Sequence, residues 1–273
     1  MATQPGSASG LDARSLLRAD GPRAALERLK QEVRKAPRDV KLRVFLFQLF
    51  CVFGEWDRAL TQLAVTSEFD AAAQPMAQAY RAAIRCEMLR ERVFAGTRTP
   101  TVFGKPEQWV SLLVEANRVL ASGKPAEAAQ LRDAAFEAAP ATPGSIDGKP
   151  FEWIADADQR LGPVLEAMIE GKYFWIPFAN IARVDIEKPA DLRDQVWLPA
   201  HFTWATKGES HGFIPTRYPG SIADEDLALS RRTEWREDGD WALGLGQRML
   251  TTDSDEVAIM DVRRLEFAAP SVA

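Results

Sequence analysis

The sequence predicts an α+β protein in which an all-helical solenoid precedes a smaller domain of helix and mostly antiparallel sheet. Helix-forming segments recur at a spacing of about 34 residues up to Pro140. After Phe151 the chain changes to short stretches rich in aromatic and β-branched residues, which are typical of strands. The charge changes as well, from 20 Lys and Arg against 16 Asp and Glu up to Pro140 to 14 against 23 beyond it.

These changes divide the chain into four parts. We expect a lead-in at 1–10, rich in Gly and Ser, and a helical repeat domain at 11–140. A linker is expected at 141–150, because the surrounding APATPGSIDGKP is dense in Pro and Gly. The C-terminal α+β domain then covers 151–273.

The helical prediction begins with VFLFQLFCVFGEWDRAL at 44–60. Its apolar run from Lys41 to Phe53 is 13 residues long, which is short for a bilayer span of about 20 residues and long for a strand. GEWDRAL has the form of the turn between the two helices of a tetratricopeptide repeat, with Trp56 covering the turn and Ala59 allowing close helix contact. The run is therefore predicted to be a buried helix of such a repeat.

The same pattern recurs on both sides of this turn. Counting back 34 residues from Ala59 leads to Ala25, and counting forward about two periods leads to Ala128, followed by Pro140 at the end of its helix. Between the two lies 74–96, which is predicted as one long helix of a degenerate repeat. The half as a whole is predicted to be a short solenoid.

A solenoid of this kind presents a concave surface that can hold a peptide or a helix. The first helix of each repeat lines this surface, so the register of the repeats selects candidate contact residues. They combine apolar, amide and basic side chains, which suit an amphipathic partner helix. The predicted partner-binding groove residues are Lys41, Val44, Gln48, Leu113 and Asn117.

The second half is predicted to hold one helix and several strands. GPVLEAMIEG, at 162–171, is expected to be the helix, with Pro in its first turn and Gly past its end. The strands are expected within 173–178, 182–187, 196–204, 241–250 and 256–267.

Three linked motifs in this half resemble those of a known family: DADQRLGPVLEAMIEGKYFWIPF, then PADLRDQVWLPAHF, then GFIPTRYPGS. In this order after a repeat region, they are similar to the ImpE/TagJ proteins, also called SciE-type virulence proteins, of bacterial type VI secretion. The resemblance implies a cytoplasmic, non-catalytic accessory protein that binds the contractile sheath through the N-terminal helix of the small sheath subunit. Other sheath or disassembly components are further candidate partners.

The motif residues are interpreted as structural or as a second contact surface. Asp156 and Asp158 are expected to cap the following helix and to pair with Arg160 or Arg193. A joint metal or acid/base site is disfavoured, because side chains two residues apart on a helix diverge. The Tyr218 hydroxyl is expected to remain in water. The family-motif positions are Asp156, Asp158, Arg160, Glu166, Trp175, Pro177, Arg193, Asp194, Trp197, Arg217 and Tyr218.

An alternative interpretation is a metal-assisted hydrolase that uses Asp156, Asp158, His201 or His211. The two histidines lack the spacing of known metal motifs, which disfavours a metal site. GLGQRM, at 244–249, lacks the third glycine of a dinucleotide fingerprint, which disfavours nucleotide binding. Basic residues alternate with acidic ones along the helices, which disfavours nucleic-acid binding. We therefore expect no metal, cofactor, small-molecule substrate, nucleic acid or membrane partner. MATQPGSASG also lacks the basic and apolar regions of a secretory signal, which favours the cytoplasm.

Overall fold

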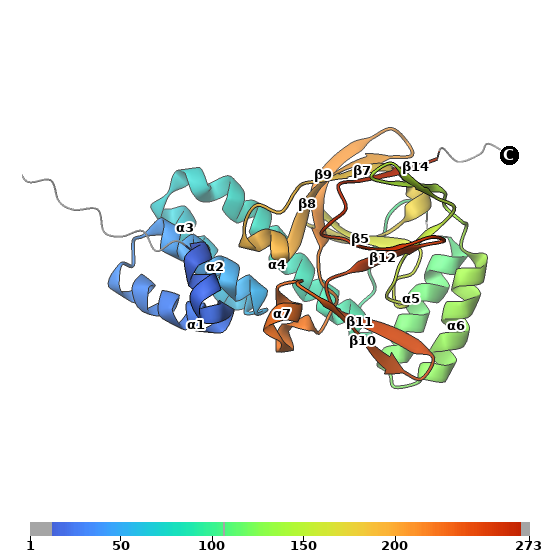
Figure 1. Ribbon diagram of the computed structural model, residues 1–273, viewed down its shortest axis with the longest axis horizontal. Coiled ribbons are helices and arrows are strands. Elements are labelled where there is room, and N and C mark those ends of the chain that lie inside the picture. The colour runs from blue at the N-terminus through green and yellow to red at the C-terminus, as the bar shows by residue number, and fades with distance from the viewer. Residues whose placement is uncertain (1–12, 106, 269–273) are drawn as a thin grey trace, which may run out of the picture. The chain divides into compact units, whose positions relative to one another are not determined.

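Figure 1 shows the protein as a computed structural model, which describes residues 13–105 and 107–268. The predicted lead-in at 1–10 lies outside these residues. The chain forms two compact units, one reaching Ala77 and the other starting at Gln78. In the described part of the chain, no helix has both the length and the apolar character that crossing a membrane requires.

The first unit is built from α-helices. Asp39 caps the second helix by accepting a hydrogen bond from the Leu42 amide at 3.1 Å, and Gly54 makes the following turn with a φ of +66°. Trp56 and Ala59, at the start of the next helix, are buried. The helix pair predicted around this turn is therefore present. The elements are α1 (Ala13–Lys35), α2 (Val40–Val52), α3 (Trp56–Phe69) and the 3-10 turn η1 (Ala71–Ala73).

The unit boundary falls within α4 (Gln74–Phe94), which corresponds to the long helix predicted at 74–96. The other helices of the second unit are α5 (Gln108–Ala121), α6 (Pro125–Ala138) and α7 (Glu225–Ala228), with 3-10 turns η2 (Phe178–Asn180), η3 (Leu192–Gln195) and η4 (Ser221–Ala223). The strands are β1 (Thr101–Val102), β2 (Gly144–Ile146), β3 (Lys149–Phe151), β4 (Ile154–Asp156), β5 (Val164–Ile169), β6 (Lys172–Pro177), β7 (Ile181–Ile186), β8 (Trp197–Trp204), β9 (Glu209–Pro215), β10 (Thr233–Asp238), β11 (Trp241–Gly246), β12 (Met249–Thr252), β13 (Glu256–Ala258) and β14 (Arg264–Phe267).

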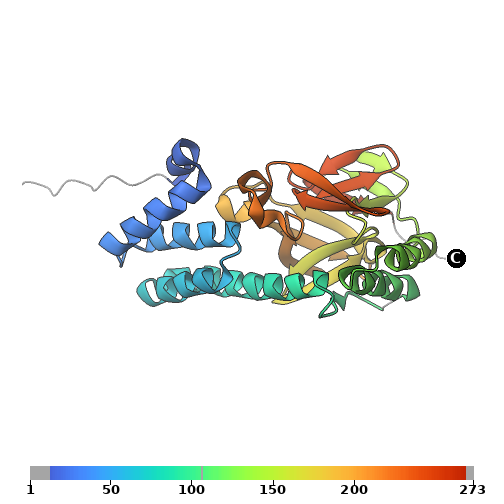
Figure 2. The same ribbon diagram turned by 90° about the horizontal axis from the view of Figure 1, so that it is seen from below.

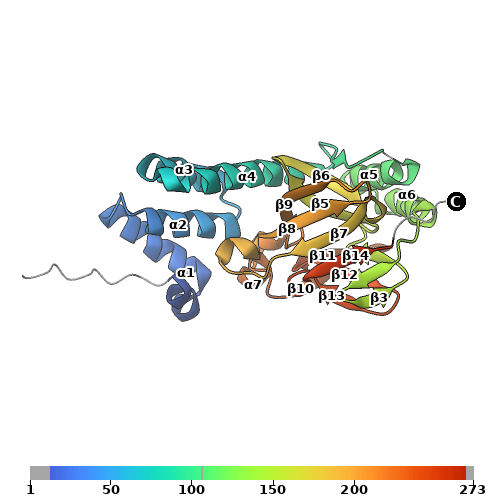
Figure 3. The same ribbon diagram turned by 90° about the horizontal axis from the view of Figure 1, so that it is seen from above.

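Nine of these strands form one sheet, in the order β1-β6-β5-β9-β8-β7-β14-β2-β3 (Figure 3). The pairings are antiparallel except that of β1 with β6, which confirms the predicted mostly antiparallel sheet. A three-stranded sheet, β13-β12-β4, and the hairpin β10-β11 accompany it. Ile176, Val184 and Leu198 are fully buried in the core of the large sheet.

The part of α4 that belongs to the second unit lies along the large sheet (Figure 2). The Tyr80 ring approaches the rings of Trp197 and Phe213, with centroids 5.9 and 5.3 Å apart. Aromatic rings therefore form this part of the contact between α4 and the large sheet. Further along α4, Phe94 lies 6.1 Å from Trp175.

Helices α5 and α6 pack on the β10-β11 hairpin. Ala116 and Ala128 share a buried cluster with Trp241 and Leu243 of β11, and the Trp241 indole donates a hydrogen bond to the Pro125 carbonyl at 3.1 Å. The predicted repeat helices are thus present, but they are divided between the two units. A continuous tetratricopeptide-like solenoid is not shown.

The helix predicted at 162–171 is wrong, because this segment forms β5 and a hairpin turn. All six residues of β5 are buried between neighbouring strands of the large sheet. Burial on both faces outweighs the helix propensity of Leu, Glu, Ala and Met. Glu170 and Gly171, both with positive φ, make the two-residue turn to β6.

The linker predicted at 141–150 is also not a linker in the structure, because it contains β2 and the start of β3. Gly144 allows this position: a Cβ there would lie 2.2 Å from the Glu266 carbonyl oxygen of β14. Asp147 and Gly148 form the two-residue turn between β2 and β3, both with positive φ. The Pro and Gly density of this segment therefore reflects a tightly packed hairpin.

Candidate functional site

The family motifs converge on a buried network of ion pairs in the second unit. Its first pair joins α4 to the large sheet. Arg90 of α4 donates to both Glu166 oxygens of β5, at 2.7 and 2.8 Å, and both side chains are almost fully buried. Such bidentate geometry gives the strongest arginine–carboxylate pairs. Arg90 also donates to the Arg217 carbonyl at 3.0 Å.

Aromatic side chains complete the surroundings of Glu166. The Tyr173 hydroxyl donates to Glu166 and accepts a hydrogen bond from the Trp175 indole at 2.7 Å. Beside them, the Trp197 indole donates to Glu87 of α4 at 3.0 Å. The tryptophans of the motifs therefore supply hydrogen-bond donors to a carboxylate network as well as apolar area.

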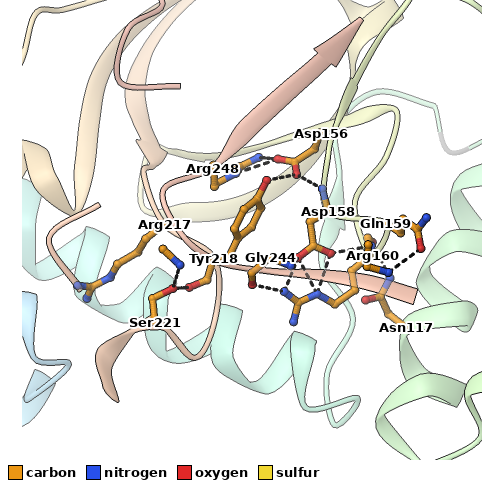
Figure 4. A network of polar contacts seen from close by, with 12 residues as sticks. Asn117, Asp156, Asp158, Gln159, Arg160, Arg217, Tyr218, Ser221, Gly244 and Arg248 are labelled. Carbon is orange, nitrogen blue, oxygen red and sulfur yellow. Dashed lines mark hydrogen bonds and ion pairs between the residues drawn. The ribbon is translucent and has the colours of Figure 1, made fainter. Parts of the chain in front are cut away.

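A second carboxylate, Asp156 at the end of β4, is held by Arg248 and Tyr218 (Figure 4). Arg248, which is fully buried, donates to Asp156 Oδ2 from Nε at 3.0 Å and from Nη2 at 2.6 Å. The Tyr218 hydroxyl donates to Asp156 Oδ1 at 3.0 Å. Arg248 Nη1 also lies 3.4 Å from Glu166, so one guanidinium links both carboxylates.

A third carboxylate, Asp158, organises the next turn. It pairs with Arg160 and accepts the Gly244 amide of β11 at 2.8 Å, as Figure 4 shows. The Arg160 carbonyl in turn accepts a hydrogen bond from Asn117 of α5 at 2.7 Å. The network therefore ties α4, α5, β4, β5, β11 and the residues beside β12 into one framework.

The two central carboxylates have opposite electrostatic settings. Burial opposes ionisation of Glu166, but Arg90 and Arg248 outweigh it and lower the pKa of Glu166 to about 2. Burial raises the pKa of Asp156 to about 6, and the attraction of Arg248 offsets this only in part. At neutral pH both groups are ionised and paired, which suits a fixed framework.

Glu166 makes stability depend on pH in acid. Its folded-state pKa lies below its ordinary value, so its stabilising contribution is present above about pH 4.5 and is lost as the pH falls towards 2. We expect the difference in unfolding free energy between the parent protein and Glu166→Gln to shrink over this window. Urea titrations at a series of pH values measure it. A constant difference would mean that Glu166 is not the titrating group.

The remaining motif residues also have structural roles. Asp191 and Asp194 form a capping box around η3, and Arg193 pairs with Asp191. The Arg193 guanidinium lies 4.7 Å from the Tyr80 ring centre, and Arg217 donates to the Ala228 carbonyl. Pro177, which is buried, ends β6 opposite Val164.

Two expectations about these motifs are wrong. Asp156 and Asp158 do not cap a helix, because the segment that follows them is β5, although the expected Asp158–Arg160 pair is present. The Tyr218 hydroxyl is not in water: the side chain is 1 % exposed, and the hydroxyl also accepts the Met249 amide at 2.9 Å.

The expected groove surface is wrong for three of its residues. Gln48 and Asn117 are buried, with 8 % and 4 % of their surface exposed, and Leu113 is fully buried. Asn117 donates to the Leu113 and Arg160 carbonyls, so it holds a loop. Lys41 is exposed and Val44 is partly exposed. The five residues also belong to different compact units.

Sequence reasoning missed two of the three arginines that pair with the network's carboxylates, although it expected Arg160 beside Asp158. Arg90 and Arg248 lie outside the quoted motifs, 76 and 92 residues from their carboxylate partners. Glu87 was missed as well, although its spacing of three residues from Arg90 places both on one face of a helix. A charged pair within the apolar stripe of 74–96 was the available signal.

The residues of the hydrolase alternative are not brought together. His201 and His211 face each other across β8 and β9, with stacked rings 4.5 Å apart. The carboxylates of Asp156 and Asp158 are already paired with Arg248 and Arg160. Across residues 13–105 and 107–268, no three His, Cys, Asp or Glu side chains gather in a way that could hold a metal ion.

Two comparisons with known proteins identify the family of this chain. Residues 148–266 match the family model described as ImpE protein. The chain is 47% identical over 257 residues to the type VI secretion system accessory component TagJ of Pseudomonas aeruginosa strain PAO1, covering 93% of this chain and 90% of the relative. The chain therefore belongs to the ImpE/TagJ family.

A solved structure shares the fold. It is an X-ray crystal structure of a protein from Vibrio parahaemolyticus, 26% identical in sequence, with a TM-score of 0.87 over 94% of this chain and 97% of the other. The similarity therefore extends over both compact units and not only over the motif-bearing segment.

Proposed function

We propose that this protein is a non-catalytic accessory component of a type VI secretion system that acts by binding other proteins. The observation that supports this is the pairing of the motif carboxylates: Asp156 and Glu166 pair with the buried Arg248 and Arg90, and Asp158 pairs with the partly buried Arg160. Such side chains build a framework, whereas a general acid or base needs to reach a substrate. The secretion system is inferred from the Pseudomonas aeruginosa relative, which is an accessory component of a type VI secretion system.

We further propose that the partner is the contractile sheath, bound through the N-terminal helix of its small subunit in the cytoplasm. Other sheath or disassembly components are secondary candidates. The α2–α3 pair in the first unit supports this proposal, because its turn matches a tetratricopeptide repeat, a repeat type suited to holding a helix. Lys41 and Val44 of α2 are the contact candidates that retain exposed surface.

A synthetic peptide of that sheath helix, taken from the same organism, tests the proposal by calorimetry. We expect roughly micromolar affinity, about −8 kcal/mol. Lys41→Glu should weaken binding several-fold, because it reverses a charge on the exposed face of α2. Lys188→Glu makes the same charge change at an exposed site in the second unit and should leave binding unchanged.

The sheath partner and the accessory role are tested separately. If the peptide does not bind, the sheath is not the partner. If affinity purification from the host also recovers no secretion-system component, the accessory role fails with it. Equal weakening by both lysine changes would remove α2 from the contact surface.

A further inference from the structure

The second unit contains a cleft of about 420 Å³ beside the C-terminal end of α6. Phe136, Ala139 and Pro140 form one side of the cleft. The other side comes from the segment around β4, which includes Trp153, and from Pro163. Most of the lining is therefore apolar, and the volume lies within the usual range for binding pockets.

Trp153 is the most unusual member of this lining. Its side chain is 40 % exposed although it stands beside apolar surface. A tryptophan left in contact with water at the mouth of an apolar cleft is typical of a residue that anchors a partner. Trp235 is equally exposed at 41 %, but it does not line the cleft.

Three acidic residues lie close in sequence to residues that line the cleft. Glu137 follows Phe136 on α6, Glu152 precedes Trp153, and the Asp253 carboxylate accepts the Glu152 amide at 2.7 Å. All three are exposed, and none forms an ion pair with another described residue. The nearby cation, Lys149, is already paired with Asp255. The chain next to the cleft lining therefore carries three exposed acidic side chains without an ion-pair partner among the described residues.

We propose that this cleft, here named the Trp153 cleft, binds a cationic amphipathic segment of a partner protein. Apolar side chains of the segment enter between α6 and β4, and its Lys or Arg residues face Glu137, Glu152 and Asp253. A second copy of this chain fits less well, because the chain carries a net charge of −5 and two acidic rims would repel each other. The proposal does not depend on the sheath being the partner.

Two synthetic helical peptides serve as probes, one built from leucine and lysine and the other with glutamate at each lysine position. The full-length protein should bind the lysine peptide and not the glutamate peptide in calorimetry. Trp153→Ala should weaken binding roughly tenfold, as expected for an anchoring aromatic. Trp153→Phe should recover part of the loss, and the pair Glu152→Gln with Asp253→Asn should weaken binding and reduce its salt dependence.

Matched changes outside the cleft are the controls. Trp235→Ala removes an equally exposed tryptophan, and Glu237→Gln with Asp238→Asn removes two exposed charges from β10. If these variants lose as much affinity as the cleft variants, the lysine peptide binds through general attraction and the proposal is overturned. Self-association that Trp153→Ala abolishes would also overturn it, in favour of a second copy. Urea midpoints of all variants establish that they remain folded.

Discussion

Replacing Glu166 by alanine is expected to lower the free energy of unfolding by about 3–5 kcal/mol, because removing one partner of a buried ion pair leaves the other charge uncompensated. The affected charge is Arg90, whose guanidinium makes both of its short carboxylate contacts with Glu166. Urea unfolding followed by tryptophan fluorescence measures the change.

An exposed pair provides the control for this experiment. Glu115 and Arg118 pair on the surface of α5, with 45% and 58% of their side chains exposed. Glu115→Ala should change stability by about 1 kcal/mol or less, because water screens and replaces such a pair. If both alanine variants unfold at the same urea concentration, the buried network does not stabilise the fold in the way described.

Gly246→Ala is expected to be the second strongly destabilising change. Gly246 has a φ of +80°, and a Cβ there would lie 2.1 Å from the Arg232 carbonyl oxygen and 2.7 Å from a Leu227 methyl carbon. The left-handed backbone and the overpacking together should cost about 2–5 kcal/mol. Thermal and urea unfolding of the variant measure the cost.

Gly148 separates these two causes. Its φ of +85° is similar, but nothing lies within 4 Å of the position of its Cβ. Gly148→Ala should therefore cost only the backbone part, about 1–2 kcal/mol. Equal losses at both glycines would show that crowding by Arg232 contributes nothing.

Much of the C-terminal sheet was predictable because its strands follow the chemistry of their residues. The segments at 173–178, 182–187 and 196–204 are rich in aromatic and β-branched residues, and they form β6, β7 and β8. The residues of β5 favour a helix, and only their burial among neighbouring strands overrides that preference. For the β2–β3 hairpin, the Asp-Gly pair was the available signal.

The candidate site was predictable in part. Its carboxylates stand within the motifs, so their importance followed from the family resemblance. Arg160 stands in the same motif as its partner Asp158 and was expected. The partners of Glu166 and Asp156 were not, because pairs 76 and 92 residues apart are brought together by tertiary folding, which one sequence does not reveal. The expected exposure of Asn117 failed for the same reason, since the loop that it holds comes from another part of the chain.

The position of β14 determines when the second unit can be completed during synthesis. This strand is the last in the described chain, yet it lies inside the large sheet, between β7 and β2. Because a ribosome releases the chain from its N-terminus, β2 and β3 emerge long before the strand that joins them to β7. The hairpin stays without this neighbour until then, so the sheet closes only after β14 has been made.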